Sequence, residues 1–285
     1  MDRDRRLCLS TSDDIRRVAR ELLEKGEVAR IYGYAEGRRG QVRPFIARTP
    51  AEAERLLFDR RCVHNLALYL LDLKAEGAEA PRVGVVMKPC DARALNVLVL
   101  EHQLDRAQVH VIGVPCNGVE GKRACGTCPD RTPPTYDTLV GEVPTEEPGQ
   151  AAEDELARLL ALPPEERRRF WAEQFARCIR CYACRQVCPM CYCEVCIAEK
   201  LDPPWESIAI APSENEFYHV LRGYHLIGRC IECGECERVC PMGIPVFLYQ
   251  RYLAEEVRRT FDFRPGMDAE TLAPFMTFRK EELEG

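Results

Sequence analysis

Two copies of one cysteine pattern constrain this chain more than any other feature of its sequence. They are Cys178-x2-Cys181-x2-Cys184-x3-Cys188-Pro189 and Cys230-x2-Cys233-x2-Cys236-x3-Cys240-Pro241. In such a run three closely spaced thiolates wrap one cubane 4Fe-4S cluster, and the fourth cysteine ligates the other cluster. We therefore predict two cross-ligated clusters, one held by Cys178, Cys181, Cys184 and Cys240 and the other by Cys230, Cys233, Cys236 and Cys188. A zinc site is the weaker alternative, since zinc knuckles have other spacings.

Length and composition bound the remaining possibilities. The 285 residues are enough for two domains with cores of their own. The 17 cysteines are odd in number and stand at ligand spacings, which favours metal binding over disulfides. The charged N-terminus lacks the apolar stretch of a signal peptide, and no segment is long and apolar enough for a membrane span, so we expect a cytoplasmic protein. A net charge of -6 gives no general attraction for nucleic acid, which we do not expect as a partner.

Strands and helices alternate in the first half. A helix capped by Ser12 or Asp13 should end at Gly26, and a capping box at Thr49 and Glu52 should open another. We predict strands at 28–34, 42–47, 82–87 and 109–114, and helices at 64–74 and 91–100. This alternation predicts an α/β domain with a largely parallel sheet over residues 1–142.

The second half has a different character. Residues 143–164 are predicted to form a linker with a short helix, residues 165–260 an α-helical domain with the two clusters, and residues 261–285 a C-terminal tail. A capping box at Ser213 and Glu216 should open a helix that ends near Gly228. The 41 residues between Cys188 and Cys230 do not fit a compact βαβ ferredoxin. Their spacing resembles the α-helical dicluster ferredoxin domains of heterodisulfide reductase C subunits and of fumarate and succinate oxidoreductase iron-sulfur subunits.

Four further cysteines are expected to face one site in the α/β half. Two predicted strands lead into Pro89-Cys90 and Pro115-Cys116, and the carboxyl ends of parallel strands meet at one edge of a sheet. Cys125 and Cys128 follow as a CxxC pair on a glycine-containing loop. Two alternatives stay open at this stage: Cys90 and Cys116 are small buried apolar residues, or the four thiols hold a structural zinc.

Three motifs of this half resemble the β subunits of coenzyme F-420 (deazaflavin) dependent hydrogenases and dehydrogenases, over roughly residues 14–142. They are Lys88-Pro89-Cys90-Asp91-Ala92-Arg93-Ala94-Leu95, then Ile112-Gly113-Val114-Pro115-Cys116, and Cys125-x2-Cys128-x-Asp130 with Gly141. The resemblance implies a 4Fe-4S cluster on Cys90, Cys116, Cys125 and Cys128, with FAD as a neighbouring cofactor. Lys88 and Arg93 are candidates to contact the cluster or an anionic cofactor; the alternative is a solvated rim.

Flavin binding is not expected to be tight in this chain. The glycine- and serine-rich segment that helps to form the flavin pocket in that family is replaced here by Arg61-Cys62-Val63-His64-Asn65. No GxGxxG fingerprint follows a predicted strand, which argues against a nicotinamide site.

Three more cysteines follow the first run closely. Cys191, Cys193 and Cys196 are predicted to hold a fourth cluster, completed by a donor such as Cys62, by a partner subunit or by no cysteine; structural thiols, or exchange with the neighbouring loop, are the alternative. Cys8 has no assigned role. The side chains of Tyr182 and Tyr192 should pack over the clusters. The histidines show no ligand spacing and are expected to be ordinary surface or core residues: His64, His102, His110, His219 and His225.

These features predict an iron-sulfur electron-transfer subunit of a cytoplasmic, anaerobic oxidoreductase complex. Its partners would be other redox subunits, either flavoproteins or hydrogenase- or dehydrogenase-like proteins. No Ser/His/Asp set, carboxylate pair or phosphate loop marks a catalytic residue. The alternative is a flavin-containing subunit that converts hydride from a deazaflavin or a similar donor into single electrons. A structural metal-binding adaptor is a third, weaker reading.

Overall fold

The computed structural model describes residues 2–77, 80–144 and 151–277, without the side chains of residues 2–10 and 151–154. The side chain of Cys8 therefore lies outside the described part. The strands are β1 (Ile31–Glu36), β2 (Val42–Ala47), β3 (Val83–Met87), β4 (Val109–Gly113) and β5 (Thr138–Leu139). The α-helices are α1 (Asp2–Glu24), α2 (Pro50–Ala53), α3 (Asp72–Glu76), α4 (Pro89–Leu100), α5 (Ala151–Leu160), α6 (Pro164–Ala176), α7 (Ala183–Gln186), α8 (Pro212–Leu226), α9 (Glu235–Arg238) and α10 (Val246–Phe261). Short 3-10 helices are η1 (Leu66–Leu71), η2 (Arg106–Gln108), η3 (Arg123–Thr127), η4 (Ile197–Glu199) and η5 (Pro274–Met276).

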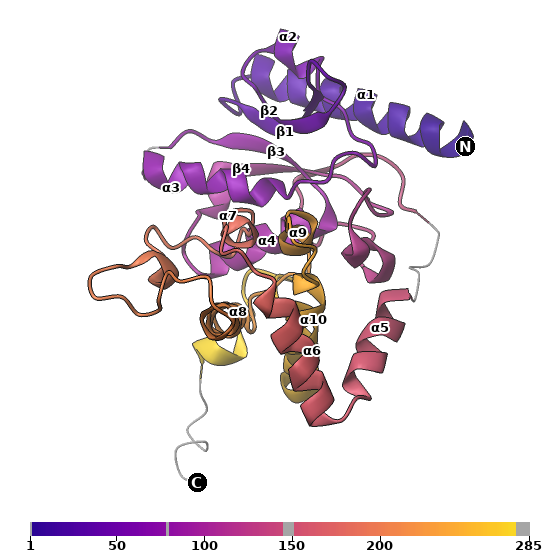
Figure 1. Cartoon of the computed structure of the whole chain (residues 1–285). Helices are drawn as coiled ribbons and strands as arrows, with labels where there is room; N and C mark the ends of the chain where they lie inside the picture. Colours follow the sequence, from indigo (N-terminus) through magenta and orange to yellow (C-terminus); the bar gives the residue numbers. More distant parts are fainter. Residues whose placement is uncertain (1, 78–79, 145–150, 278–285) are drawn as a thin grey trace.

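One five-stranded sheet organises the first half, in the order β2-β1-β3-β4-β5. β1 and β2 form an antiparallel hairpin, and every other neighbouring pair is parallel. All five residues of β3 are buried, as expected of a parallel strand covered on both faces. The long helix α1 lies on one side of the sheet and α4 on the other (Figure 1). The predicted largely parallel α/β fold is confirmed.

Helices form the second half. α6, α8 and α10 lie beyond α4, away from the sheet, with α5 alongside (Figure 1). Seven buried residues make their core: Leu156, Leu159, Trp171, Phe175, Ile244, Val246 and Leu248. α5 contributes two of them, so the helix expected in the linker packs as part of the helical layer. The predicted helical second half is confirmed. In the described part of the chain, no helix is long and apolar enough to cross a membrane.

Two predicted helix starts are wrong. α1 begins at Asp2, upstream of the proposed caps, and the Ser12 hydroxyl instead accepts a hydrogen bond from the Phe58 backbone N–H at 3.0 Å. α8 begins at Pro212 with Ala211 as its cap, which places Ser213 inside the first turn. Proline suits the first helical position because its missing N–H has no intrahelical partner there. The Thr49 cap of α2 is confirmed.

The two halves share one core. Met190, Leu226 and Ile231 of the second half are buried in the same apolar cluster as the sheet residues. The segment after α10 also returns to the first half, where the Pro265 and Gly266 carbonyls accept hydrogen bonds from Arg93 and Asn96, both at 3.0 Å. The part of the predicted C-terminal tail that the structure describes is therefore docked against α4, not detached.

Candidate iron-sulfur centres

Four cysteines of the two runs surround one small cavity. Its wall contains Cys178, Cys181, Cys184, Cys240, Tyr182, Tyr218 and His219, among others. The first three thiols come from the loop that leads into α7, whereas Cys240 follows α9. The ring of His219 stacks on Phe175 at 4.4 Å between centroids, and burial, with the nearby Arg222 and Arg180 charges, lowers the pKa of His219 to about 3. His219 is therefore neutral at pH 7, and its buried Nε2 has no hydrogen-bond partner among the described residues.

The other four cysteines surround a second cavity. Its wall contains Cys188, Cys230, Cys233, Cys236, Arg222 and Gln250, among others. Cys188 thus lies with the second run and Cys240 with the first, which is the exchange of fourth cysteines that the spacing predicts. The grouping of thiols agrees with the predicted ligand sets, and the ligation itself stays a prediction.

The two loops repeat one backbone conformation. Arg180 and Tyr182 in the first loop have φ of 54° and 56°, and Glu232 and Gly234 at the matching positions have φ of 57° and 70°. Left-handed residues in such loops turn successive N–H groups toward one centre, a geometry suited to anionic groups. One of these amides, the Arg180 N–H, already donates to the Cys178 thiol at 3.4 Å. The two cysteine runs therefore repeat a backbone conformation suited to binding an anion as well as a cysteine spacing.

Gly234 marks where the second loop touches the α/β half. A Cβ at Gly234 would lie 2.6 Å from the Cβ of Ala124 in η3, the short helix that carries Cys125. The equivalent Tyr182 faces no such neighbour and instead packs edge-to-face on Tyr218, with ring centroids 5.3 Å apart. The close approach to Ala124 requires glycine here, and the left-handed backbone angle favours it.

Replacing Gly234 by alanine should therefore destabilise the protein by about 1–3 kcal/mol, through left-handed strain and overpacking. The loss is measured as the shift of the midpoint in anaerobic urea unfolding. Adding Ala124→Gly removes the facing methyl group and should recover the overpacking part only. Gly126→Ala is the control, because nothing lies within 4 Å of a Cβ there. Equal stability of Gly234→Ala and the control would contradict this account.

The third set of cysteines gathers around the ends of β3 and β4. Cys116 accepts a hydrogen bond from the Gly118 N–H at 3.3 Å, and Cys125 accepts one from the Val119 N–H at 3.4 Å. Cys116 also lies within electrostatic range of Cys125 and Cys128. Cys90 opens α4 and is close to Lys88, Lys122 and Cys233, on the side of the second cavity. The thiols of Cys116, Cys125 and Cys128 thus lie close together. Cys90 and Cys116 are both close to the Lys88 ammonium.

Burial decides the protonation of these thiols. It raises the pKa of Cys116 to about 11 and that of Cys90 well above its ordinary value. Both thiols are therefore protonated at neutral pH even with the nearby lysine charges, whereas metal ligation requires the thiolate. Iron would supply the charge that replaces these protons.

Lys88 is buried, so the alternative of a solvated rim is wrong. Its ammonium is 2.9 Å from the Asp91 carboxylate, donates to the His64 carbonyl at 2.8 Å and also bonds the Tyr34 hydroxyl. These partners hold the Lys88 ammonium inside the protein, so it does not contact a cofactor at the surface. Its positive charge lies close to the thiols of Cys90 and Cys116. Lys88 remains a candidate for balancing the charge of a cluster.

Arg93 is buried, and its guanidinium bonds three segments that lie far apart in the sequence. Its Nε donates to the Pro265 carbonyl at 3.0 Å, and its Nη1 donates to Asp130 and to the Ile231 carbonyl, each at 3.2 Å. Within the described part of the chain its Nη2 has no acceptor. The Arg93 charge acts on the Cys128 thiol. Arg93 therefore joins α4 to the loop of Asp130 and to the segments of Ile231 and Pro265.

The sequence reading missed a buried ion pair between two of the cysteine sets. Lys122 and Glu235 pair with each other, and both side chains are only 1% exposed. Lys122 lies near Cys90 and Cys233, which belong to different predicted clusters. Glu235 also binds Arg238 at 2.6 Å. The pair thus places a cation between the third site and the second cavity.

Cys191, Cys193 and Cys196 line a third cavity, of about 330 Å³, together with residues of α8. Cys62 is not there. It is fully buried in the α/β core and accepts a hydrogen bond from the Asp59 N–H at 3.3 Å, so its suggested role as a fourth donor is wrong.

The two tyrosines expected over the clusters differ. Tyr182 lines the cavity of Cys178, Cys181, Cys184 and Cys240, as expected. The ring of Tyr192 instead packs against Arg229, whose guanidinium lies 4.9 Å from the ring centre.

Two of the five residues that replace the flavin-pocket motif are buried in the core, whereas Arg61 is exposed. Cys62 and Asn65 are 0% and 2% exposed, and Asn65 caps η1 with its side chain. The His64 carbonyl is occupied by Lys88.

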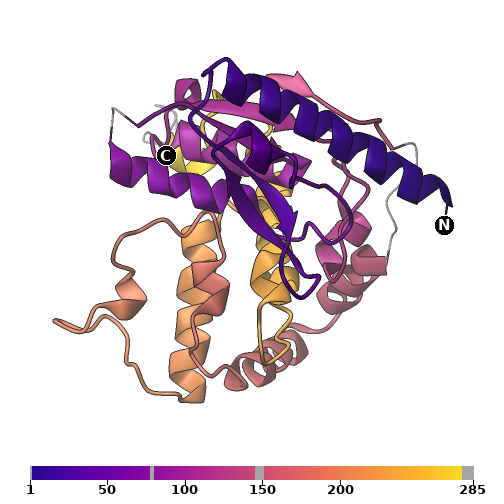
Figure 2. The same cartoon turned by 90° about the horizontal axis from the view of Figure 1, so that it is seen from above.

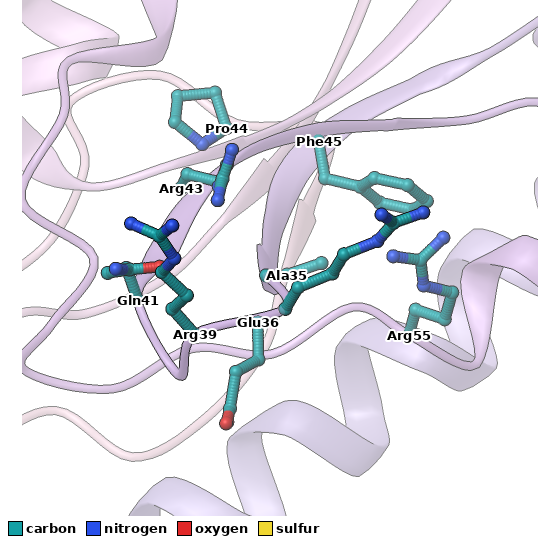
Figure 3. A pocket seen from close by; sticks show the side chains of 10 residues that line it. Ala35, Glu36, Arg39, Gln41, Arg43, Pro44, Phe45 and Arg55 are labelled. Carbon is teal, nitrogen blue, oxygen red and sulfur yellow. The ribbon is translucent and has the colours of Figure 1, made fainter.

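A larger hollow, of about 830 Å³, lies at the β1–β2 hairpin (Figure 3). Arg38, Arg39, Arg43 and Arg55 line it against a single carboxylate, Glu36. These arginines are exposed, and the Arg55 guanidinium lies 4.4 Å from the centre of the Phe45 ring. The hollow can attract anions but contains none of the predicted site residues.

Comparison with known proteins agrees with both halves of the sequence reading. Residues 174–244 match the 4Fe-4S dicluster domain family. A 98-residue stretch is 39% identical to the β subunit of an F420-dependent formate dehydrogenase from Methanocaldococcus jannaschii, covering 34% of this chain and 25% of that protein. A 100-residue stretch is 37% identical to the F420-dependent formate dehydrogenase 1 β subunit of Methanococcus maripaludis, covering 35% and 25%. The chain thus spans about a quarter of the length of these relatives. It carries a 4Fe-4S dicluster domain in its helical half and is similar, over about a third of its length, to F420-dependent formate dehydrogenase β subunits.

Proposed function

We propose that this chain is an iron-sulfur electron-transfer subunit of an oxidoreductase complex. The observation that carries the proposal is the grouping of the eight dicluster cysteines around two cavities, each with three thiols from one run and one from the other. When bound, 4Fe-4S clusters supply one-electron carriers. The chain supplies thiolates, inward-facing amides from the left-handed loop residues, and apolar walls that exclude water.

A third cluster on Cys90, Cys116, Cys125 and Cys128 belongs to the same proposal. Two observations support it: amide donors already point at Cys116 and Cys125, and the Lys88 and Lys122 charges lie beside Cys90. Close packing of Gly234 on Ala124 fixes this site against the second dicluster loop. The proposed relay therefore continues from the helical half into the α/β half.

Partners are proposed from the surface and from the relatives. From Val195, among the extra cysteines, to the start of α8, five large apolar side chains are 61–65% exposed: Val195, Leu201, Trp205, Ile208 and Ile210. Both views show this segment projecting from the body of the protein (Figures 1 and 2). Exposed apolar side chains gathered in one segment are typical of a protein interface. We infer that another redox subunit binds here, in a reducing cytoplasm where the thiols stay available as ligands.

The second candidate is a flavin-containing subunit that takes hydride from a deazaflavin. It is favoured by the similarity to β subunits of F420-dependent enzymes. Against it stands the replacement of the glycine- and serine-rich segment by residues 61–65, of which Cys62 and Asn65 are buried in the core.

One measurement separates the two candidates. We expect the anaerobically reconstituted chain to contain at least roughly twelve irons and as many sulfides, four for each of three clusters. Denaturation should release no flavin detectable by fluorescence. About eight irons would remove the third cluster from the proposal. Stoichiometric FAD or FMN in the supernatant would instead favour the hydride-accepting flavoprotein.

A further inference from the structure

The cavity beside Cys191, Cys193 and Cys196 differs from the two dicluster cavities in size. It measures about 330 Å³, against about 20 Å³ for each of the others. Its thiols come from the segment after the first run, and its opposite wall is the C-terminal end of α8, with Arg222, His225 and Leu226. Side chains of the described residues leave this space open.

The lining provides a fourth ligand beside the three thiols. His225 lies on this wall, one helical turn from Arg222, and is the one imidazole among the residues that line the cavity. A histidine nitrogen can replace a cysteine thiolate on an iron of an iron-sulfur cluster. The sequence reading treated His225 as an ordinary surface residue, since it lies 29 or more positions from these cysteines.

A buried cation points to an anionic occupant. The Arg222 residue is 6% exposed, and its Nη2 donates to the Cys184 carbonyl at 3.0 Å. Its Nε and Nη1 are buried and have no acceptor anywhere in the described ranges. A buried guanidinium without acceptors is strongly unfavourable, so such a group calls for a negative partner. Arg222 lines both this cavity and the cavity of Cys188, so its charge faces an anionic occupant of either one. The other two arginines of the lining are already paired, Arg185 with Glu199 and Arg229 with Glu101.

The geometry suits a cluster better than a single ion. No three His, Cys, Asp or Glu side chains in the described part of the chain converge closely enough to hold one metal ion. The eight cysteines of the dicluster domain also form no such group. The four ligands of a cubane bind four different irons, so their sulfur atoms lie farther apart than the ligands of a single ion. The lack of such a group among the described residues therefore does not count against a cubane on these three thiols.

We propose that Cys191, Cys193 and Cys196 hold a fourth 4Fe-4S cluster, that His225 binds its fourth iron, and that Arg222 provides a positive charge between this cluster and the cavity of Cys188. The inference extends the proposed iron-sulfur function and adds a site outside the two-cluster pattern. A neutral imidazole in place of a thiolate leaves the cluster less negative, which raises its potential. The fourth cluster is thus the first to be reduced, and it lies next to the exposed apolar segment proposed to bind a partner.

The test compares iron, sulfide and spectra among anaerobically reconstituted variants of the full chain. Cys191→Ser/Cys193→Ser/Cys196→Ser should lose about four irons and four sulfides per chain. Cys62→Ala is the matched control, a buried cysteine outside the cavity, and should keep them all. Loss of one metal without loss of sulfide would show a single-ion site, and an unchanged iron and sulfide content would show that the cavity holds no cluster; either result overturns the inference.

His225 is tested separately. The chain labelled with 15N-histidine is poised where only the first cluster to be reduced is paramagnetic, and pulsed paramagnetic resonance should then show coupling to 15N. His225→Cys should keep the iron content, abolish this coupling and lower the potential of that cluster. Retention of the coupling in His225→Cys would exclude His225 as the ligand. Cys181→Ser reports on the dicluster domain alone: if neither its iron content nor its paramagnetic resonance spectrum changes, the proposed function fails, independently of the fourth cluster.

Discussion

Replacing Cys188 by serine should remove the cluster of the second run and leave the cluster next to it in sequence intact. Cys188 lines the cavity of Cys230, Cys233 and Cys236, and serine is a poor substitute for a thiolate ligand. We expect the variant to lose about four irons per chain, or to keep a markedly altered second cluster. Iron analysis and paramagnetic resonance of the reduced protein measure the effect.

Two matched pairs of variants make the assignment decisive. The spectrum lost in Cys188→Ser should be the one lost in Cys233→Ser, and the spectrum lost in Cys240→Ser should be the one lost in Cys181→Ser. Cys62→Ala, a buried cysteine outside these cavities, should lose neither. If Cys188→Ser instead matches Cys181→Ser, each run holds its own cluster and the exchange is wrong.

Removing the carboxylate of Glu235 should have the largest effect on folding stability among charge substitutions near the clusters. Glu235→Gln leaves the Lys122 ammonium buried at 1% exposure without its partner. Breaking a buried pair on one side costs about 3–5 kcal/mol, because the remaining charge is neither solvated nor paired. The free energy is followed by anaerobic urea unfolding with circular dichroism.

Replacing both members of the pair should cost less than replacing Glu235 alone. In Lys122→Met/Glu235→Gln no ammonium remains buried, so part of the lost stability should return. Glu256→Gln is the control, since Glu256 forms an exposed pair with Arg259 and its loss should leave the urea midpoint nearly unchanged. A double variant less stable than Glu235→Gln would show that the lysine stabilises the fold by itself.

Local patterns explain why much of the fold was predictable. β3 and β4 are short apolar runs that end at Pro-Cys, and the parallel sheet follows from their alternation with helices. The two helix starts that were wrong, at Ser12 and Ser213, show the limit of such signals. A serine near a helix start resembles a cap in sequence, but Ser12 bonds Phe58 across the core and Pro212 opens α8 one residue earlier.

The sequence by itself determined which cysteines of the dicluster domain lie together, because loop spacing alone fixes how three thiols and a distant fourth can surround a cubane. Only the tertiary structure decided what surrounds them. The Lys122–Glu235 pair, the unpaired Arg222 donors and the place of His225 all depend on segments that meet through packing of the two halves on one core. Neither 3.6-residue periodicity nor motif spacing records such contacts, since they join side chains far apart in the chain whose neighbours are set by burial.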